Sequence, residues 1–225
     1  MKKEVLAAIV GNITGDGHLQ CDGKRGIIFF YSKQYKKVDK FKKCFENMFK
    51  LNGRIRRPIY TGKAYTSRYY VCFSSKKVAE FLKSIGTPVG NKTNSVFLVP
   101  DWIRNGTKNV RKAYLKALFD CEACIYVTRI YNNKRWRITI EQYKSSILED
   151  NGIMYLDQIR DMLENFGIHT SPIRTGKMNI RKDGSISICH RFDIEKKHFI
   201  SFYRNINFGD KNKKLKLLKA LQAEV

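Results

Sequence analysis

Two acidic residues occupy matching places in this chain and could together hold a metal ion. Asp16 stands where the apolar run within AAIVGNITGDGHL (7–19) ends, and Glu122 stands at the matching place within AYLKALFDCEACI (113–125). Both stretches read as helices, so each carboxylate stands at the end where the helix dipole disfavours negative charge. Two such carboxylates side by side repel each other and resist ionisation. A divalent cation, Mg²⁺ or Mn²⁺, would remove that penalty, with substrate phosphate as a further ligand.

Small residues in both stretches indicate how the two acids could be brought together. Gly11 and Gly15 stand four apart, on one face of the first helix, and Ala117 and Cys121 hold the same places in the second. Small side chains at this spacing let two helix backbones approach closely. We therefore expect the helices to pack across a pseudo-twofold axis. The alternative is tight packing alone, with each acid a solvated residue at a helix end.

The elements around the two helices recur in the same order, which indicates an internal duplication. PIYTGK (58–63) recurs as PIRTGK (172–177), the lysine pair 76–77 recurs at 196–197, and GNK (90–92) recurs as GDK (209–211). We expect two halves, 1–105 and 106–225, joined near PDWIRNGTKNV (100–110), where the pattern breaks. Each half reads as helix, two strands, helix, two strands, helix.

Alternating side chains mark the strands and their two faces. In KRWRITIEQ (134–142), the side chains of Arg135, Arg137 and Thr139 point one way, while Trp136 and Ile138 point the other way. One apolar face and one basic face fit antiparallel sheets that pack on one side only. The predicted fold class is α+β.

Composition favours a nucleic-acid partner. Lys and Arg number 44 against 20 Asp and Glu, a formal charge of +24, which attracts polyanions. The alternatives are lysines that only keep the protein in solution and a structural or ribosome-associated basic protein. We expect no signal peptide, no membrane-spanning helix and a cytoplasmic, nucleoid-associated location. The six cysteines are scattered, and the pair Cys121 and Cys124 lacks the second pair that a zinc site needs.

The two nonapeptides carry a family resemblance. IVGNITGDG (9–17) and LKALFDCEA (115–123) resemble the paired motifs of LAGLIDADG homing endonucleases, and GTPVGNKTNSVFLVPDWI (86–103) resembles the segment before the second motif. The resemblance covers nearly the whole chain. It implies a monomer whose two αββαββα halves form a saddle of antiparallel sheets in the DNA major groove. The implied activity is metal-dependent cleavage of both DNA strands at a long asymmetric site, which promotes intron mobility.

The resemblance also assigns residues. The metal-binding acids fall on Asp16 and Glu122, the basic residues near the active sites on Lys92 and Lys211, and an assisting polar residue on Gln142, with Ser32 or Lys33 in the first half. The expected DNA contacts in the first half are Lys24, Arg25, Arg54, Arg56, Tyr60, Lys63, Arg68 and Tyr70. In the second half they are Arg129, Lys134, Arg135, Arg137, Thr139, Arg174, Lys177 and Arg181.

Three residues depart from the family pattern. Thr14 replaces the first acid of the motif, Asn12 interrupts its apolar run, and Ala123 stands where the family has a helix-ending glycine. Because alanine is less comfortable than glycine in a left-handed cap, we expect the second site to be the less secure one. The rival functions are an RNA-binding maturase of the host intron and a DNA-binding relative that does not cleave.

Overall fold

The computed structural model describes residues 2–57, 68–130, 133–181 and 183–223. Two of the expected DNA contacts, Tyr60 and Lys63, lie outside these residues. Among the helices of the described residues, none is long and apolar enough to cross a membrane.

The first half alternates helices and strands in the predicted order. Its elements are α1 (Lys3–Thr14), β1 (Gly17–Cys21), β2 (Gly26–Ser32), α2 (Tyr35–Phe49), β3 (Arg54–Arg56), β4 (Tyr69–Ser74) and α3 (Lys76–Ser84). The short helix α4 (Asp101–Arg104) precedes the second motif.

The second half repeats this order with longer strands. Its elements are α5 (Lys108–Glu122), β5 (Cys124–Ile130), β6 (Asn133–Ser145), the 3₁₀ turn η1 (Ser146–Leu148), α6 (Glu149–Glu164), β7 (Arg174–Ile180), β8 (Ile186–Ile194), the 3₁₀ turn η2 (Lys196–His198), α7 (Phe199–Asn205) and α8 (Lys211–Gln222). The α+β class and the αββαββα order of each half are therefore confirmed.

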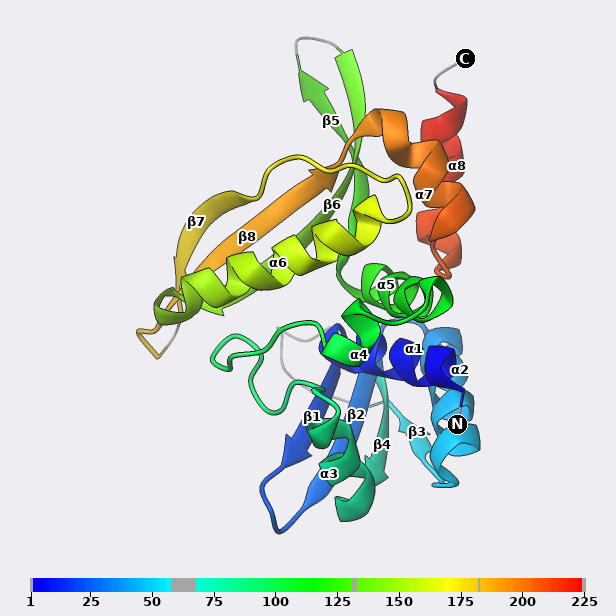
Figure 1. Ribbon diagram of the computed structural model, residues 1–225, viewed down its shortest axis with the longest axis vertical. Helices are drawn as coiled ribbons and strands as arrows, with labels where there is room; N and C mark the ends of the chain where they lie inside the picture. The colour runs from blue at the N-terminus through cyan, green and yellow to red at the C-terminus, as the bar shows by residue number, and fades with distance from the viewer. Residues whose placement is uncertain (1, 58–67, 131–132, 182, 224–225) are drawn as a thin grey trace.

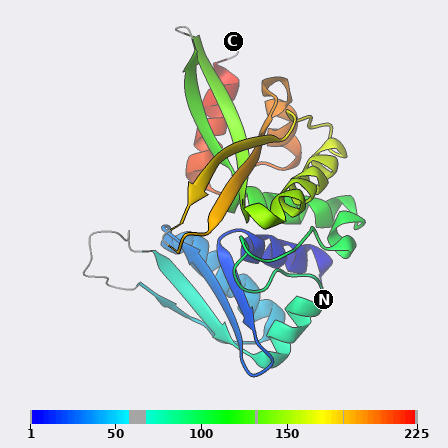
Figure 2. The same ribbon diagram turned by 90° about the vertical axis from the view of Figure 1, so that its left-hand side faces the viewer.

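Each half builds one antiparallel four-stranded sheet. The strand orders are β1-β2-β4-β3 and β5-β6-β8-β7, so the two sheets have the same topology. In Figure 1, α1 and α5 lie side by side across the middle of the molecule, with the first sheet below them and the second above. Figure 2 shows the same arrangement from the side.

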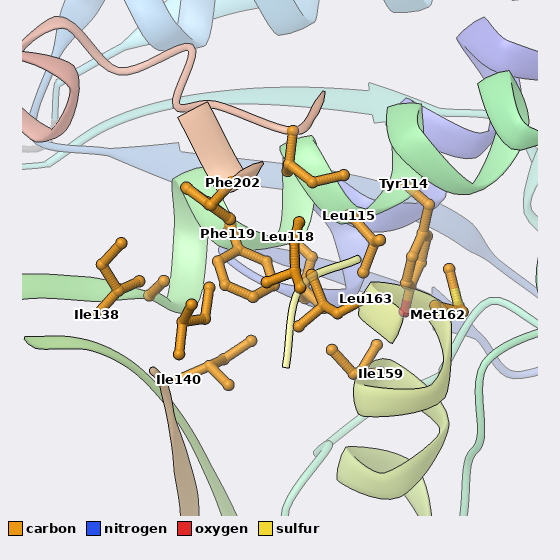
Figure 3. Packing of buried hydrophobic residues seen from close by; sticks show 14 of the residues in the cluster. Tyr114, Leu115, Leu118, Phe119, Ile138, Ile140, Ile159, Met162, Leu163 and Phe202 are labelled. Carbon is orange, nitrogen blue, oxygen red and sulfur yellow. The ribbon is translucent and has the colours of Figure 1, made fainter. Parts of the chain in front are cut away.

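Side chains alternate between buried and half-exposed along the strands, which leaves one face of each sheet open. On β2, Ile28 and Phe30 are fully buried, whereas Phe29 and Tyr31 between and beyond them are half-exposed. The buried faces pack against α2 and α3 in the first half. In the second they pack against α5, α6 and α7, as the side chains in Figure 3 show.

Residues 97–103 pack with the second half although they precede the second motif. Phe97, Val99 and Ile103 are buried in the same core as α5 and α6. Trp102 is partly buried against both cores. The boundary at 105/106 remains a prediction, since the segment on its N-terminal side contributes to both cores.

Candidate active site

The contact between α1 and α5 uses the small residues that the sequence singled out. A Cβ at Gly11 would lie 2.7 Å from the Tyr114 carbonyl oxygen and 3.1 Å from the Ala117 Cβ. A Cβ at Gly15 would lie 2.3 Å from the Cys121 Cβ. Since ordinary carbon contacts are about 3.5–4.0 Å, only glycine allows this approach. The interface brings the C-terminal ends of the two helices together.

Both helix ends differ from the expected left-handed cap. Gly15 caps α1 at φ −80°, and Ala123 caps α5 in extended backbone at φ −76° and ψ 143°. The prediction that Ala123 would be strained is therefore wrong, because an extended backbone suits alanine as well as any residue. Gly17, the counterpart of Ala123, avoids a steric clash: its Cβ would lie 2.6 Å from the Ile13 Cα.

The Glu122 carboxylate reaches across the interface to the end of the other helix. A Cβ at Gly15 would lie 3.5 Å from its Oε1, one residue before Asp16. Burial raises the pKa of Glu122, Lys92 opposes that rise, and the Asp16 charge adds to it. In the part of the chain that the structure describes, no hydrogen bond or ion pair satisfies this carboxylate. Asp16 and Glu122 thus form the repelling pair that the sequence predicts.

Lys92 lies at the C-terminal end of α1, next to the two acids. Its ammonium donates hydrogen bonds to the carbonyls of Thr14 at 2.8 Å and Gly17 at 3.1 Å, and also to Gly15. Burial lowers the pKa of Lys92, while Glu122 and other nearby acidic groups oppose that change. The ammonium therefore caps the end of α1 and presents a fixed positive charge to the acids.

A second lysine, Lys37 in the first turn of α2, bridges the two halves. Its Nζ lies 3.0 Å from Asp16 Oδ2 and 2.9 Å from the carbonyl oxygen of Asp120 at the end of α5. Burial acts to lower the pKa of Lys37, but Cys121 and Asp16 outweigh burial and raise it. Sequence reasoning missed this residue because nothing in α2 indicates which of its lysines turns inward.

In the second half, the lysine at the helix end is Lys213, not the predicted Lys211. Lys213 Nζ donates to the carbonyls of Phe119 at 3.1 Å and Asp120 at 2.7 Å, as Lys92 does at α1. Lys211 is exposed at the start of α8. Asp210 caps this helix by accepting a hydrogen bond from the Lys213 backbone N–H. The helix therefore turns Lys213 toward the end of α5, although aligning GNK with GDK matches Lys92 to Lys211, two residues earlier.

Gln142 makes no contact with the acids among the described residues. It lies on β6 opposite His190 of β8, and its side-chain amide donates to the Tyr143 carbonyl at 3.3 Å. Its assisting role remains a prediction. Ser32, the corresponding residue of the first half, accepts from the Gln34 backbone N–H at 3.2 Å.

The expected DNA contacts divide between exposed and enclosed positions. Ten of them are exposed on turns and strands: Lys24, Arg25, Arg54, Arg56, Arg68, Arg129, Lys134, Arg135, Arg174 and Lys177. Tyr70 is half-exposed on the open face of β4, and Arg181 is held by Thr93 at 2.9 Å. The predicted DNA contact by Thr139 is wrong: its side chain is 1% exposed, because Asp193 and the arginine partners of Asp193 cover it. Those partners are Arg137 and Arg174.

The acid pair fits a hard divalent cation. Among the described residues, no group of three or more His, Cys, Asp or Glu side chains could enclose a metal. Mg²⁺ does not require such a group, since it commonly takes one or two carboxylates and completes its shell with water and phosphate. The unsatisfied Glu122 carboxylate supports this fit. Lys37 acts against it, because the lysine already neutralises Asp16.

Comparison with known proteins identifies one domain of the chain. The model of the LAGLIDADG-like domain matches residues 109–207, from α5 to just beyond the end of α7. The whole chain is similar in structure to the homing endonuclease I-WcaI bound to its DNA recognition sequence, with a TM-score of 0.60 and 13% identity over 96% of this chain and 87% of that one. The chain thus contains a LAGLIDADG-like domain.

A second solved structure has the same fold. Full-length DUF199/WhiA from Thermatoga maritima gives a TM-score of 0.53 at 12% identity, over 100% of this chain and 62% of that one. Because both identities are low, these likenesses establish the fold and leave the activity of this protein open.

The sequence relatives carry several different names. The tRNA-splicing ligase RtcB of Pyrococcus furiosus is 30% identical over 96% of this chain and 22% of its own length. The RNA polymerase subunit Rpo1N of Methanocaldococcus jannaschii is 26% identical over 81% of this chain and 14% of its own length. This chain thus spans less than a quarter of either relative, and the similarity belongs to a segment that these differently named proteins share.

Proposed function

We propose that this protein is a divalent-metal-dependent endonuclease that cuts both strands of DNA at a long asymmetric site and so promotes intron mobility. The observation that carries the proposal is the meeting of Asp16 and Glu122 at the ends of two packed helices, with Lys37, Lys92 and Lys213 around them. Three ammonium groups lie among these two carboxylates and the carboxylate of Asp120. Fixed cations beside the acid pair suit a phosphodiester anion.

Each residue of this cluster has a role in the proposed reaction. Asp16 and Glu122 would hold a Mg²⁺ or Mn²⁺ ion, which would supply Lewis-acid activation of water and charge stabilisation at the scissile phosphate. Lys92 and Lys213 are fixed by helix-end carbonyls, so their charges stand ready to offset the negative charge that develops during phosphoryl transfer. Lys37 forms an ion pair with Asp16, which fixes the carboxylate in position and neutralises its charge as long as no divalent cation is bound.

The open faces of the two sheets are the proposed DNA-binding surface. Arginine and lysine side chains on turns and strands supply phosphate contacts, which hold the duplex in register. Side chains on the strand faces can reach base edges in the major groove, where each base pair is distinguishable. The DNA-bound state of I-WcaI supports DNA as the partner of this protein.

A plasmid cleavage assay tests the proposal. The plasmid carries the two sequences that flank the gene joined together, and it is incubated with protein and Mg²⁺. We expect a linear product with wild type and none with Asp16→Asn, whose DNA affinity stays within about threefold of wild type. The control is Asp101→Asn, an exposed acid at the start of α4, which should cleave normally.

The ion pair between Lys37 and Asp16 favours a second candidate, a nucleic-acid-binding protein that does not cleave. In that case the lysine is a permanent substitute for the metal, and the bound partner is DNA or the host intron RNA. Wild-type protein would then bind the plasmid or the intron transcript tightly and yield no linear DNA at any Mg²⁺ or Mn²⁺ concentration.

A further inference from the structure

A buried carboxylate on the open face of the second sheet holds two arginines in fixed positions. Asp193 accepts hydrogen bonds at 2.5 Å from Thr139 Oγ1, Arg137 Nη1 and Arg174 Nη2. Burial acts to raise the pKa of Asp193, but these three donors outweigh burial and lower it. The carboxylate is thus a charged anchor at physiological pH.

The arginines reach this anchor from two neighbouring strands. Thr139 of β6 lies directly opposite Asp193 of β8, and Arg137 is two residues before it on the same face. Arg174 comes from β7, on the other side of β8. Asp193 and the two arginines line a cavity of about 550 Å³, whose other charged lining residues are Lys134, Arg135, Lys196 and Glu195. The cavity is therefore both concave and strongly basic.

The hydrogen bonds to Asp193 occupy only part of each guanidinium group. The side chains of Arg137 and Arg174 are 29% and 48% exposed, against 10% for Asp193. Arg137 also donates from Nε to Thr128, which leaves its Nη2 without a partner among the described residues. In Arg174, Nε and Nη1 likewise have no hydrogen-bond partner among the described residues. Both guanidinium groups can still donate to a ligand.

The fold itself does not require the acid. In the first sheet, His18 pairs with Phe29 and Phe29 with Cys72, as Cys124 pairs with Thr139 and Thr139 with Asp193. Cys72 therefore occupies the place of Asp193, and Phe29 that of Thr139. Since an ion pair of this kind adds little stability over apolar packing, the acid calls for a reason other than stability.

We propose that Asp193 positions Arg137 and Arg174 to recognise a guanine in the half of the DNA site that the second sheet contacts. Arginine donates two parallel hydrogen bonds to guanine O6 and N7, the most frequent specific contact in the major groove. A guanidinium already fixed by a carboxylate loses less freedom when it binds. Asp193 is a positioning residue, and the arginines are the specificity determinants. The proposal rests on the proposed function, because it requires DNA on this face.

Selection from a library of random-sequence duplexes tests the inference. Wild-type protein, with Ca²⁺ in place of Mg²⁺ to prevent cleavage, should select a site with one strongly preferred guanine. At that position Asp193→Asn should lose discrimination, from about 10- to 100-fold down to less than threefold, while preferences elsewhere persist. Arg174→Ala, which removes a half-exposed side chain, should lose the same position and keep its fold. The control is Asp157→Asn on α6, which removes the same charge from an aspartate paired with Arg160 away from this cavity and should change no preference.

Two results overturn the inference, and they differ from each other. If wild type selects a consensus and both Asp193→Asn and Arg174→Ala select the same one, the inference fails while the proposed function stands. The same conclusion follows if either variant weakens all positions uniformly, since that is the effect of a structural role. If wild type selects no consensus at all, the proposed function fails and the inference fails with it.

Discussion

Substituting Gly15 by alanine tests the helix interface on which the acid pair depends. The new methyl carbon would lie 2.3 Å from the Cys121 Cβ, about 1.2–1.7 Å closer than an ordinary carbon contact allows. Because the Cys121 Cβ is attached directly to the α5 backbone and cannot rotate away, the two helix ends must separate to accommodate the new methyl group. Overpacking of this kind costs about 1–3 kcal/mol. At about 2–4 °C per kcal/mol for a chain of this size, we expect the melting temperature to fall by about 2–12 °C.

The same separation moves Asp16 away from Glu122. A displacement of about 1 Å at a reacting centre can reduce a rate 100-fold, so cleavage should fall by at least 10-fold even at temperatures where the variant is folded. The double variant Gly15→Ala/Cys121→Gly exchanges the small residue between the helices and removes the clash. Its destabilisation should be smaller than the sum of the two single variants by about 1–2 kcal/mol.

Thermal unfolding and plasmid cleavage of the four proteins measure this double-mutant cycle. Gly176→Ala is the control for the substitution itself, because the nearest atom to its added Cβ, the Cys189 carbonyl oxygen, is 3.3 Å away, against 2.3 Å at Gly15. If Gly15→Ala melts within 1 °C of wild type, or if the two substitutions are additive, the helices are not in the close contact described above. The small-residue spacing would then have no bearing on the acids.

Three other predictions concern lysines. Burial lowers the pKa of the fully buried Lys144 to about 8 from 10.5, so the unfolded chain binds more protons between these values and stability should rise with pH through that window, by up to about 3 kcal/mol. In urea titrations at pH 8 and 10.5, Lys144→Met should lose most of this rise; an unchanged rise would contradict the burial of the charge. Lys37→Met should bind Mn²⁺ several-fold more tightly by calorimetry, since Asp16 loses its competing partner, and equal affinity would mean that the lysine does not compete. Lys213→Met should reduce cleavage at least 10-fold while the exposed Lys211→Met cleaves normally, and the reverse order would restore the assignment made from the motif.

Patterns repeated within one element could be read from the sequence. The four-residue spacing of Gly11 and Gly15 predicts a close helix contact because it depends only on helical periodicity, and the contact with α5 is present. Alternation along β6 predicts which side chains face the core, and Ile138 and Ile140 are buried there. Such predictions succeed because the geometry that they need is local.

Features that depend on distant partners could not be read in this way. Lys37 contacts the carbonyl of Asp120, 83 residues away, and no pattern in α2 distinguishes it from its neighbouring lysines. The matching GNK and GDK sequences point to Lys211, whereas the helix cap at Asp210 determines that Lys213 turns inward. Thr139 alternates correctly with its neighbours, yet it is covered by a carboxylate from β8. In each case the deciding atom belongs to another element.

The two halves agree where they meet each other and differ where they face outward. At the interface, glycine, alanine and cysteine fill equivalent places, and a lysine caps each helix. On the open faces, Phe29, Tyr31 and Tyr70 contact one another in the first sheet. The same register places in the second sheet are held by Thr139, Glu141 and Arg191, next to the two arginines anchored by Asp193. Rings offer apolar contact, which suits thymine methyl groups, and guanidinium groups suit guanine. A duplex with two identical half-sites would match one face and mismatch the other. If both sheets bind DNA as proposed, the target must therefore have unlike halves.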